Sequence, residues 1–227
     1  MSDPCSFADP LLRWWRSEDR IAKYPWRMEK DPYRIAVSEI LLQRTRRDAV
    51  ARVYSKFFEK FPTADSLSRA SEMEVSETIK SLGLAKRARY LIEVARALRK
   101  GGISSGSRSE LPRVLGLGRY SRSMILSAVS GERTVAVDKN VARVICRTFG
   151  IAPKNPGRPQ DDSLVNEIAL RCAPRENVRE YNLALLDLGW EVCLPRKPKC
   201  GECPISGLCS FAMKVRGSAK TGAPPHP

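Results

Sequence analysis

Apolar residues recur every three or four positions along most of this chain, and almost nowhere do apolar and polar residues alternate. The first spacing is typical of helices with one buried face and the second of strands, so the sequence predicts an all-α fold. A first helix is expected within residues 1–23, and a second begins at Pro32 and runs to about Phe58. Further helices are expected at 64–70, 72–80 (with Ser71 and Glu74 as a capping box), 86–99, 120–129, 140–149, 162–172 and 176–189.

Stretches rich in Gly, Pro and Ser interrupt the helical pattern at 101–109 and 151–160, where we expect loops. The polar sequence that follows Val215, RGSAKTGAPPHP, predicts a disordered tail. No internal repeat is visible beyond the alternation of helices and turns.

The composition indicates a globular protein with an anionic partner. Hydrophobic residues make up 42% of the 227 residues, which is ordinary for a folded domain. The 40 Lys and Arg residues outnumber the 25 Asp and Glu residues, and the net charge of +15 favours a polyanion such as DNA. No apolar run reaches membrane-spanning length and the first residues do not resemble a secretory signal, so we expect a cytoplasmic protein.

The cysteines predict a metal centre near the C-terminus. Four of the seven follow the spacing C-x6-C-x2-C-x5-C, which suits either a zinc ion or a [4Fe–4S] cluster. The other three are Cys5, Cys146 and Cys172; we expect them to be buried small hydrophobic residues without a disulfide. The only histidine is His226, so catalysis by a Ser/His or Cys/His pair is excluded.

Two glycines precede the helix expected at 120–129. Gly116 and Gly118 lie in Leu115-Gly116-Leu117-Gly118, and glycines before a helix leave N–H groups that can bind an anion. On so basic a chain, the expected anion is a DNA phosphate. An ordinary connection between two helices explains this turn equally well.

Two carboxylates stand out. Asp138 lies just before the helix expected at 140–149, where a helix N-cap is its ordinary role. Glu39 lies in a run too apolar for a surface helix and shares a face with Gln43, four residues later. A glutamate in such a setting needs a partner or a function, and a paired core carboxylate is the alternative.

Together these features resemble the helix-hairpin-helix DNA glycosylases, the superfamily of endonuclease III, MutY and the archaeal thymine-DNA mismatch glycosylases. The resemblance covers about residues 24–210, and Leu115 departs from it because the family hairpin usually has proline there. It implies two helical domains with a DNA-binding cleft between them. These are a six-helix barrel domain with the hairpin at 24–132, and an iron–sulfur domain formed by 1–23 and 133–215, before a disordered tail at 216–227.

The same resemblance favours iron–sulfur over zinc. The run Asn182 to Gly189, which leads into the cysteines, resembles the iron–sulfur module of endonuclease III and MutY. It implies a structural [4Fe–4S] cluster held by Cys193, Cys200, Cys203 and Cys209.

The resemblance also implies catalytic roles for three residues. Asp138 matches the catalytic aspartate, which stabilises positive charge on the sugar as the base leaves. Glu39 matches the glutamate of the base pocket. Tyr120 stands where bifunctional relatives have the lysine that forms a Schiff base, and tyrosine cannot form one. We therefore expect base release without strand cleavage.

Further residues are expected to contact DNA. Arg44 matches a position that enters the base stack, as in the mismatch thymine glycosylases, and Leu84 matches the wedge into the opposite strand. A basic loop between the first two cysteines of the cluster could lie on the phosphate backbone, although a solvated charged loop is the plainer interpretation. The expected DNA-binding residues are Gln43, Arg44, Leu84, Gly116, Gly118, Arg119, Arg196, Lys197 and Lys199.

The resemblance implies a monofunctional DNA glycosylase of base excision repair, which we expect to be a monomer. Its expected substrate is double-stranded DNA in which a flipped thymine or uracil was mispaired with guanine. A MutY-type adenine glycosylase, a helix-hairpin-helix module that only binds DNA and a zinc-stabilised scaffold are the alternatives.

Overall fold

The computed structural model describes residues 5–16, 18–83, 85–100 and 116–221. Every regular element in these ranges is helical, which confirms the predicted all-α class. The chain divides into two compact units, Glu18–Glu132 and Met1–Ser17 with Arg133–Pro227, which we call the hairpin unit and the cysteine unit. No helix in the described ranges is long and apolar enough to cross a membrane.

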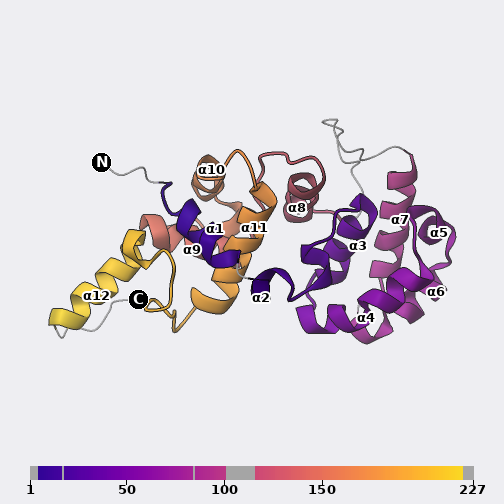
Figure 1. Ribbon diagram of the computed structural model, residues 1–227, viewed down its shortest axis with the longest axis horizontal. Coiled ribbons are helices and arrows are strands. Elements are labelled where there is room, and N and C mark those ends of the chain that lie inside the picture. The colour runs from indigo at the N-terminus through magenta and orange to yellow at the C-terminus, as the bar shows by residue number, and fades with distance from the viewer. Residues whose placement is uncertain (1–4, 17, 84, 101–115, 222–227) are drawn as a thin grey trace. The chain divides into compact units, whose positions relative to one another are not determined.

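The hairpin unit is built around α3. Figure 1 shows this helix with α7 and α8 packed against it. Aromatic residues fill the core beside it, and the hydroxyl of Tyr33 donates a hydrogen bond of 2.7 Å to the carbonyl oxygen of Phe61. The elements are α2 (Glu18–Ile21), η1 (Pro25–Arg27), α3 (Pro32–Leu42), α4 (Arg47–Lys60), α5 (Ala64–Arg69), α6 (Glu72–Thr78), η2 (Lys80–Leu82), α7 (Arg87–Arg99) and α8 (Arg119–Val129).

The expected helix from Pro32 to Phe58 is wrong, because the chain breaks between α3 and α4. At Gln43 the backbone leaves the helical region with ψ 118°, and Arg44 takes a left-handed conformation with φ 53°. The sequence contains no Gly or Pro here that would signal such a break. Other local predictions hold, since Ser71 and Glu74 form the expected capping box of α6.

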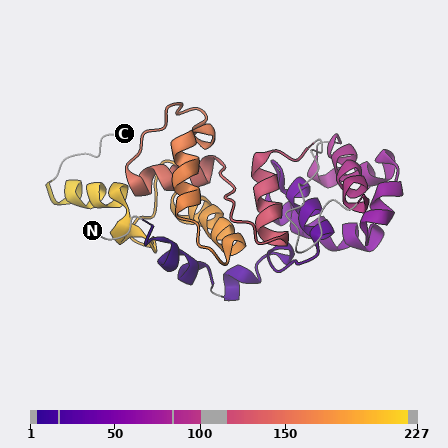
Figure 2. The ribbon, with the colours of Figure 1, turned by 90° about the horizontal axis from the view of Figure 1, so that it is seen from above.

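The cysteine unit joins the N-terminal helix to the last third of the chain. Helix α1 lies beside α11, as Figure 2 shows. The indole nitrogen of Trp15 donates a hydrogen bond of 2.9 Å to Asp187 there. The elements are α1 (Ala8–Trp15), α9 (Lys139–Phe149), η3 (Pro159–Asp161), α10 (Ser163–Arg171), α11 (Val178–Asp187), the π-helix η4 (Leu188–Val192), η5 (Ser206–Leu208) and α12 (Ser210–Thr221).

Two expectations about this unit are wrong. Cys5 and Cys172 form a disulfide across 167 residues, whereas we expected both to be unpaired; Cys146 is free. The pairing depends on α1 packing into this unit, which no local pattern reveals. The tail expected to be disordered from residue 216 begins as helix, because α12 continues to Thr221.

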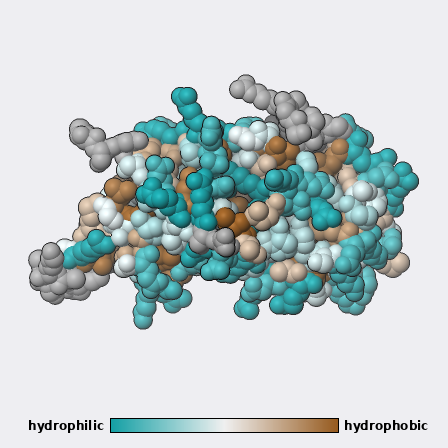
Figure 3. Space-filling model, in the orientation of Figure 1, coloured by the Kyte–Doolittle hydropathy of each residue, from teal (hydrophilic) through white to brown (hydrophobic). Residues whose placement is uncertain are grey.

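The surface agrees with the polar composition. On the face shown in Figure 3, hydrophilic residues dominate and the hydrophobic ones form small, scattered patches. A few large apolar side chains are exposed, and Trp190 in η4 is 58% exposed. Isolated residues of this kind are normal on a protein surface.

Candidate functional site

The predicted hairpin forms a tight turn before α8. Gly116 has φ +94°, and a Cβ there would lie only 2.7–2.8 Å from ring and Cβ atoms of Tyr90, so only glycine fits. Gly118 is the N-cap of α8 and has open space around it, with no side chain to cap the helix. Arg119 follows it and is exposed. Uncapped N–H groups beside an exposed arginine suit a phosphate.

The end of α3 lies against this hairpin. The amide nitrogen Nε2 of Gln43 donates a hydrogen bond of 2.7 Å to the carbonyl oxygen of Gly116. Glu39, one helical turn earlier, is buried with 9% of its surface exposed, whereas Arg44 is exposed. Gln43 was predicted to bind DNA; its Nε2 already holds the hairpin in place.

Tyr120 is half-buried in the first turn of α8. It therefore follows the hairpin directly, as the sequence predicted. Leu84 of the predicted site lies outside the described residues, as does Leu115 of the hairpin.

Asp138 is the N-cap of α9, which is the ordinary structural role that the sequence suggested for it. Its Oδ1 accepts a hydrogen bond of 2.7 Å from the backbone N–H of Val141, and its Oδ2 accepts one of 3.0 Å from Nδ2 of Asn140. The side chain is half-buried. Both oxygens are held in place, yet the carboxylate is still open to a reactant, so the N-cap geometry is compatible with catalysis.

Hydrogen bonds connect Asp138 to the start of the cysteine loop. Nη2 of Arg143 donates to Oδ1 of Asn140 at 3.0 Å and to the carbonyl oxygen of Gly189 at 2.7 Å. Its Nε donates to the carbonyl oxygen of Cys193 at 2.8 Å. Sequence reasoning missed Arg143 and Gly189 because the contacts of Arg143 with Gly189 and Cys193 span 46 and 50 residues. It also missed Asn140, for which closeness to Asp138 and Arg143 was the only local signal.

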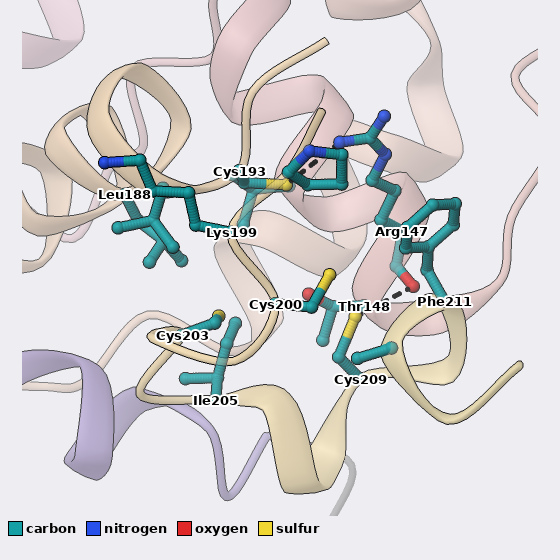
Figure 4. A pocket seen from close by; sticks show the side chains of 14 residues that line it. Arg147, Thr148, Leu188, Cys193, Lys199, Cys200, Cys203, Ile205, Cys209 and Phe211 are labelled. Atoms are coloured by element: carbon teal, nitrogen blue, oxygen red, sulfur yellow. Dashed lines mark hydrogen bonds between the residues drawn. The ribbon is translucent and has the colours of Figure 1, made fainter. Parts of the chain in front are cut away.

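The four cysteines surround one hollow (Figure 4), which Val144, Leu188, Val192 and Ile205 also line. Burial raises the pKa of Cys200, and that of Cys203 to about 11, so a metal that binds these two cysteines must displace their protons. Four thiols that line one apolar hollow suit a metal centre with thiolate ligands.

Arg147 braces this loop from α9. Its guanidinium donates hydrogen bonds of 2.7 Å to the carbonyl oxygens of Leu194 and Pro195, and Nη1 lies 3.5 Å from the sulfur of Cys193. It also lies over the ring of Phe211, with 4.7 Å from its Cζ to the ring centroid. These contacts fix the position of the first cysteine of the loop.

The basic loop is exposed, as predicted. Arg196, Lys197 and Lys199 all lie at the surface, and Lys199 approaches Glu202 at 3.9 Å. An exposed pair at that distance contributes little to stability, so these charges are available to a polyanion.

Comparison with known proteins identifies the family. Residues 37–169 match the HhH-GPD superfamily base excision DNA repair protein model, and residues 193–209 match the iron-sulfur binding domain of endonuclease III. The chain belongs to the HhH-GPD superfamily. The second match begins and ends on Cys193 and Cys209, the outer cysteines of the loop.

Relatives of this HhH-GPD chain are DNA glycosylases. It is 34% identical to a thymine/uracil-DNA glycosylase of Methanothermobacter thermautotrophicus, over 92% of this chain and 94% of that protein. It is 32% identical to the human adenine DNA glycosylase, over 95% of this chain but only 41% of that protein. A solved thermostable thymine-DNA glycosylase matches with a TM-score of 0.80 and 33% identity, over 93% of this chain and 97% of that one.

These findings confirm several predictions. The chain is a DNA glycosylase of base excision repair, it has the helix-hairpin-helix fold, and its cofactor is a [4Fe–4S] cluster. Its substrate is DNA.

Proposed function

We propose that this glycosylase releases thymine or uracil mispaired with guanine and leaves the DNA strand intact. The observation that carries the proposal is the similarity to a thymine/uracil-DNA glycosylase over nearly the whole length of both chains. Tyr120 supports the second part, because the position that follows the hairpin offers no amine for a Schiff base.

Asp138 is the proposed catalytic carboxylate. As the base leaves, the sugar gains positive charge, and a carboxylate held in one place stabilises that charge without having to reorganise. It can also orient the water that attacks the sugar. The hydrogen bonds from Val141 and Asn140 supply the fixed position. Glu39, buried on α3, would bind the edge of the flipped base.

The remaining site residues would hold the DNA. Backbone N–H groups at Gly116 and Gly118, with Arg119, would bind a phosphate, and Arg44 with Leu84 would fill the space that the flipped base leaves. The loop of Arg196, Lys197 and Lys199 would contact the backbone elsewhere. The cluster would be held by Cys193, Cys200, Cys203 and Cys209, and when bound it would stabilise the shape of that loop.

An adenine glycosylase is the second candidate. The similarity to the human adenine DNA glycosylase favours it, although this chain spans less than half of that protein.

With either activity, the proposed enzyme acts as a monomer on chromosomal DNA in the cytoplasm.

Single-turnover base release tests the proposal. The duplexes would carry T·G, U·G, A·G or A opposite 8-oxoguanine, each assayed with and without alkali. We expect release of T and U opposite G, with strand breaks only after alkali. Release of adenine alone would move the chain to the second candidate, and breaks without alkali would refute the monofunctional part.

Asp138→Asn tests the catalytic residue. Asparagine is also a good N-cap, so α9 should remain folded while base release falls by about a thousandfold or more. Asp161→Asn is the matched control, because Asp161 is an exposed aspartate of the same unit and pairs with Arg158. Equal rates for the two variants would show that Asp138 is only a cap.

A further inference from the structure

Arg87, the first residue of α7, is a buried cation without a carboxylate. Only 2% of its surface is exposed, and it has no ion pair within the described part of the chain. Its Nη1 donates one hydrogen bond, of 3.1 Å, to the carbonyl oxygen of Leu41. Its Nε and Nη2 are buried without any hydrogen-bond partner. Burial lowers the pKa of this guanidinium.

An arginine in this environment does not contribute favourably to the stability of the folded protein. A buried charge with unsatisfied donors costs free energy, and an apolar side chain of similar volume is often neutral or better at such a position. The neighbouring Arg89 shows the ordinary arrangement, since it is exposed and pairs with Glu93 at 2.9 Å. A role other than stability therefore has to account for Arg87.

The acceptor of its single hydrogen bond lies at the end of α3. In a longer helix the N–H of Thr45 would bond the carbonyl of Leu41, but here it bonds the carbonyl of Leu42 at 3.2 Å. Arg87 supplies the missing donor. Its positive charge also lies at the C-terminal, negative end of the α3 dipole, which favours a cation there.

The turn that Arg87 holds is the strained one between α3 and α4. Arg44 occupies a left-handed conformation there, which costs a side-chain-bearing residue about 1–3 kcal/mol and persists only where the surroundings impose it. Gln43 fastens the same turn to the hairpin through Gly116. The turn is therefore held from two sides, by Arg87 on α7 and by Gln43 against the hairpin.

We propose that Arg87 is a positioning residue that fixes the α3–α4 turn so that Arg44 can enter the DNA stack when the target base flips. The proposal rests on the proposed function, in which Arg44 replaces lost stacking.

Three variants test this role. Arg87→Met removes the charge and the hydrogen bond but retains volume, Arg87→Lys restores one donor and the charge, and Arg89→Met is the control with the same loss of charge. Single-turnover release would be compared for thymine opposite guanine and for thymine opposite an abasic site, where no base pair has to open. Hydrogen exchange of residues 43–46 gives a readout that needs no substrate.

We expect Arg87→Met to melt close to the Arg89→Met control, because removing the buried, unsatisfied donors offsets the loss of the hydrogen bond to the Leu41 carbonyl. In Arg87→Met, the rate of thymine release opposite guanine should fall about tenfold or more, which is the effect expected from losing one charge-assisted hydrogen bond. The rate of thymine release opposite an abasic site should fall less. Residues 43–46 should exchange faster, and Arg87→Lys should recover part of each effect.

Other outcomes overturn the inference. Unchanged exchange at 43–46 in Arg87→Met would show that Arg87 does not hold the turn. Equal losses on paired and unpaired targets, together with a lower melting temperature, would mean a purely structural role. If the parent enzyme releases no base at all, the proposed function fails, and the exchange experiment still decides whether Arg87 holds the turn.

Discussion

Replacing Gly189 with alanine should displace Asn140 and, with it, the carboxylate of Asp138, which we propose to be catalytic. A Cβ at residue 189 would lie 2.9 Å from Cβ of Asn140 and 3.1 Å from its carbonyl carbon and oxygen. Carbon atoms pack best at about 3.5–4.0 Å, so α9 or η4 must shift by roughly 0.6 Å or more. Backbone atoms cannot avoid the clash by changing rotamer, and overpacking of this kind costs about 1–3 kcal/mol.

The shift would reach Asp138 through the Nδ2 of Asn140, which donates to Oδ2 of the carboxylate. Because a small displacement of a reacting group lowers the reaction rate strongly, we expect base release to slow by about tenfold to a hundredfold. The melting temperature should fall by about 2–4 °C for each kcal/mol of overpacking.

The assay compares Gly189→Ala with Gly207→Ala, a glycine of the same unit around which a Cβ meets nothing within 4 Å. Single-turnover base release, thermal unfolding and iron content would be measured for both. If Gly189→Ala releases base and unfolds like the control, the contact with Asn140 does not constrain the carboxylate and our reasoning is wrong.

Two further predictions concern other residues. Tyr120→Lys should provide the missing amine, so borohydride should trap a covalent DNA complex that the parent enzyme does not form; no trapped complex would mean that residue 120 does not reach the sugar. Hydrogen bonds from backbone N–H groups, above all that of Lys154, lower the pKa of Asp162. Its carboxylate therefore stabilises the fold above the unfolded-state pKa, and that stabilisation is lost as the pH falls through the lower folded-state value. Asp162→Asn should accordingly melt lower than the parent at neutral pH, with the difference shrinking in acid; a constant difference would contradict this linkage.

Local patterns were enough to predict most helices. The apolar period, the capping box before α6 and the Asp before α9 all depend on contacts within a few residues, and such contacts are visible in sequence. The break at Gln43 was missed for the opposite reason. Nothing local disfavours a helix there, and bonds from Arg87 and to Gly116, both distant in sequence, hold the turn.

The candidate site divides in the same way. Short sequence motifs were enough to predict the family, the cluster and the candidate residues Asp138, Glu39 and Tyr120. Each of these motifs lies within a short stretch of the chain, so its residue types and their spacing are visible in the sequence. Only the tertiary structure showed that Asn140 and Arg143 link Asp138 to the cysteine loop. It alone also paired Cys5 with Cys172. These contacts join residues far apart in the chain, so they depend on how helices pack rather than on any local pattern.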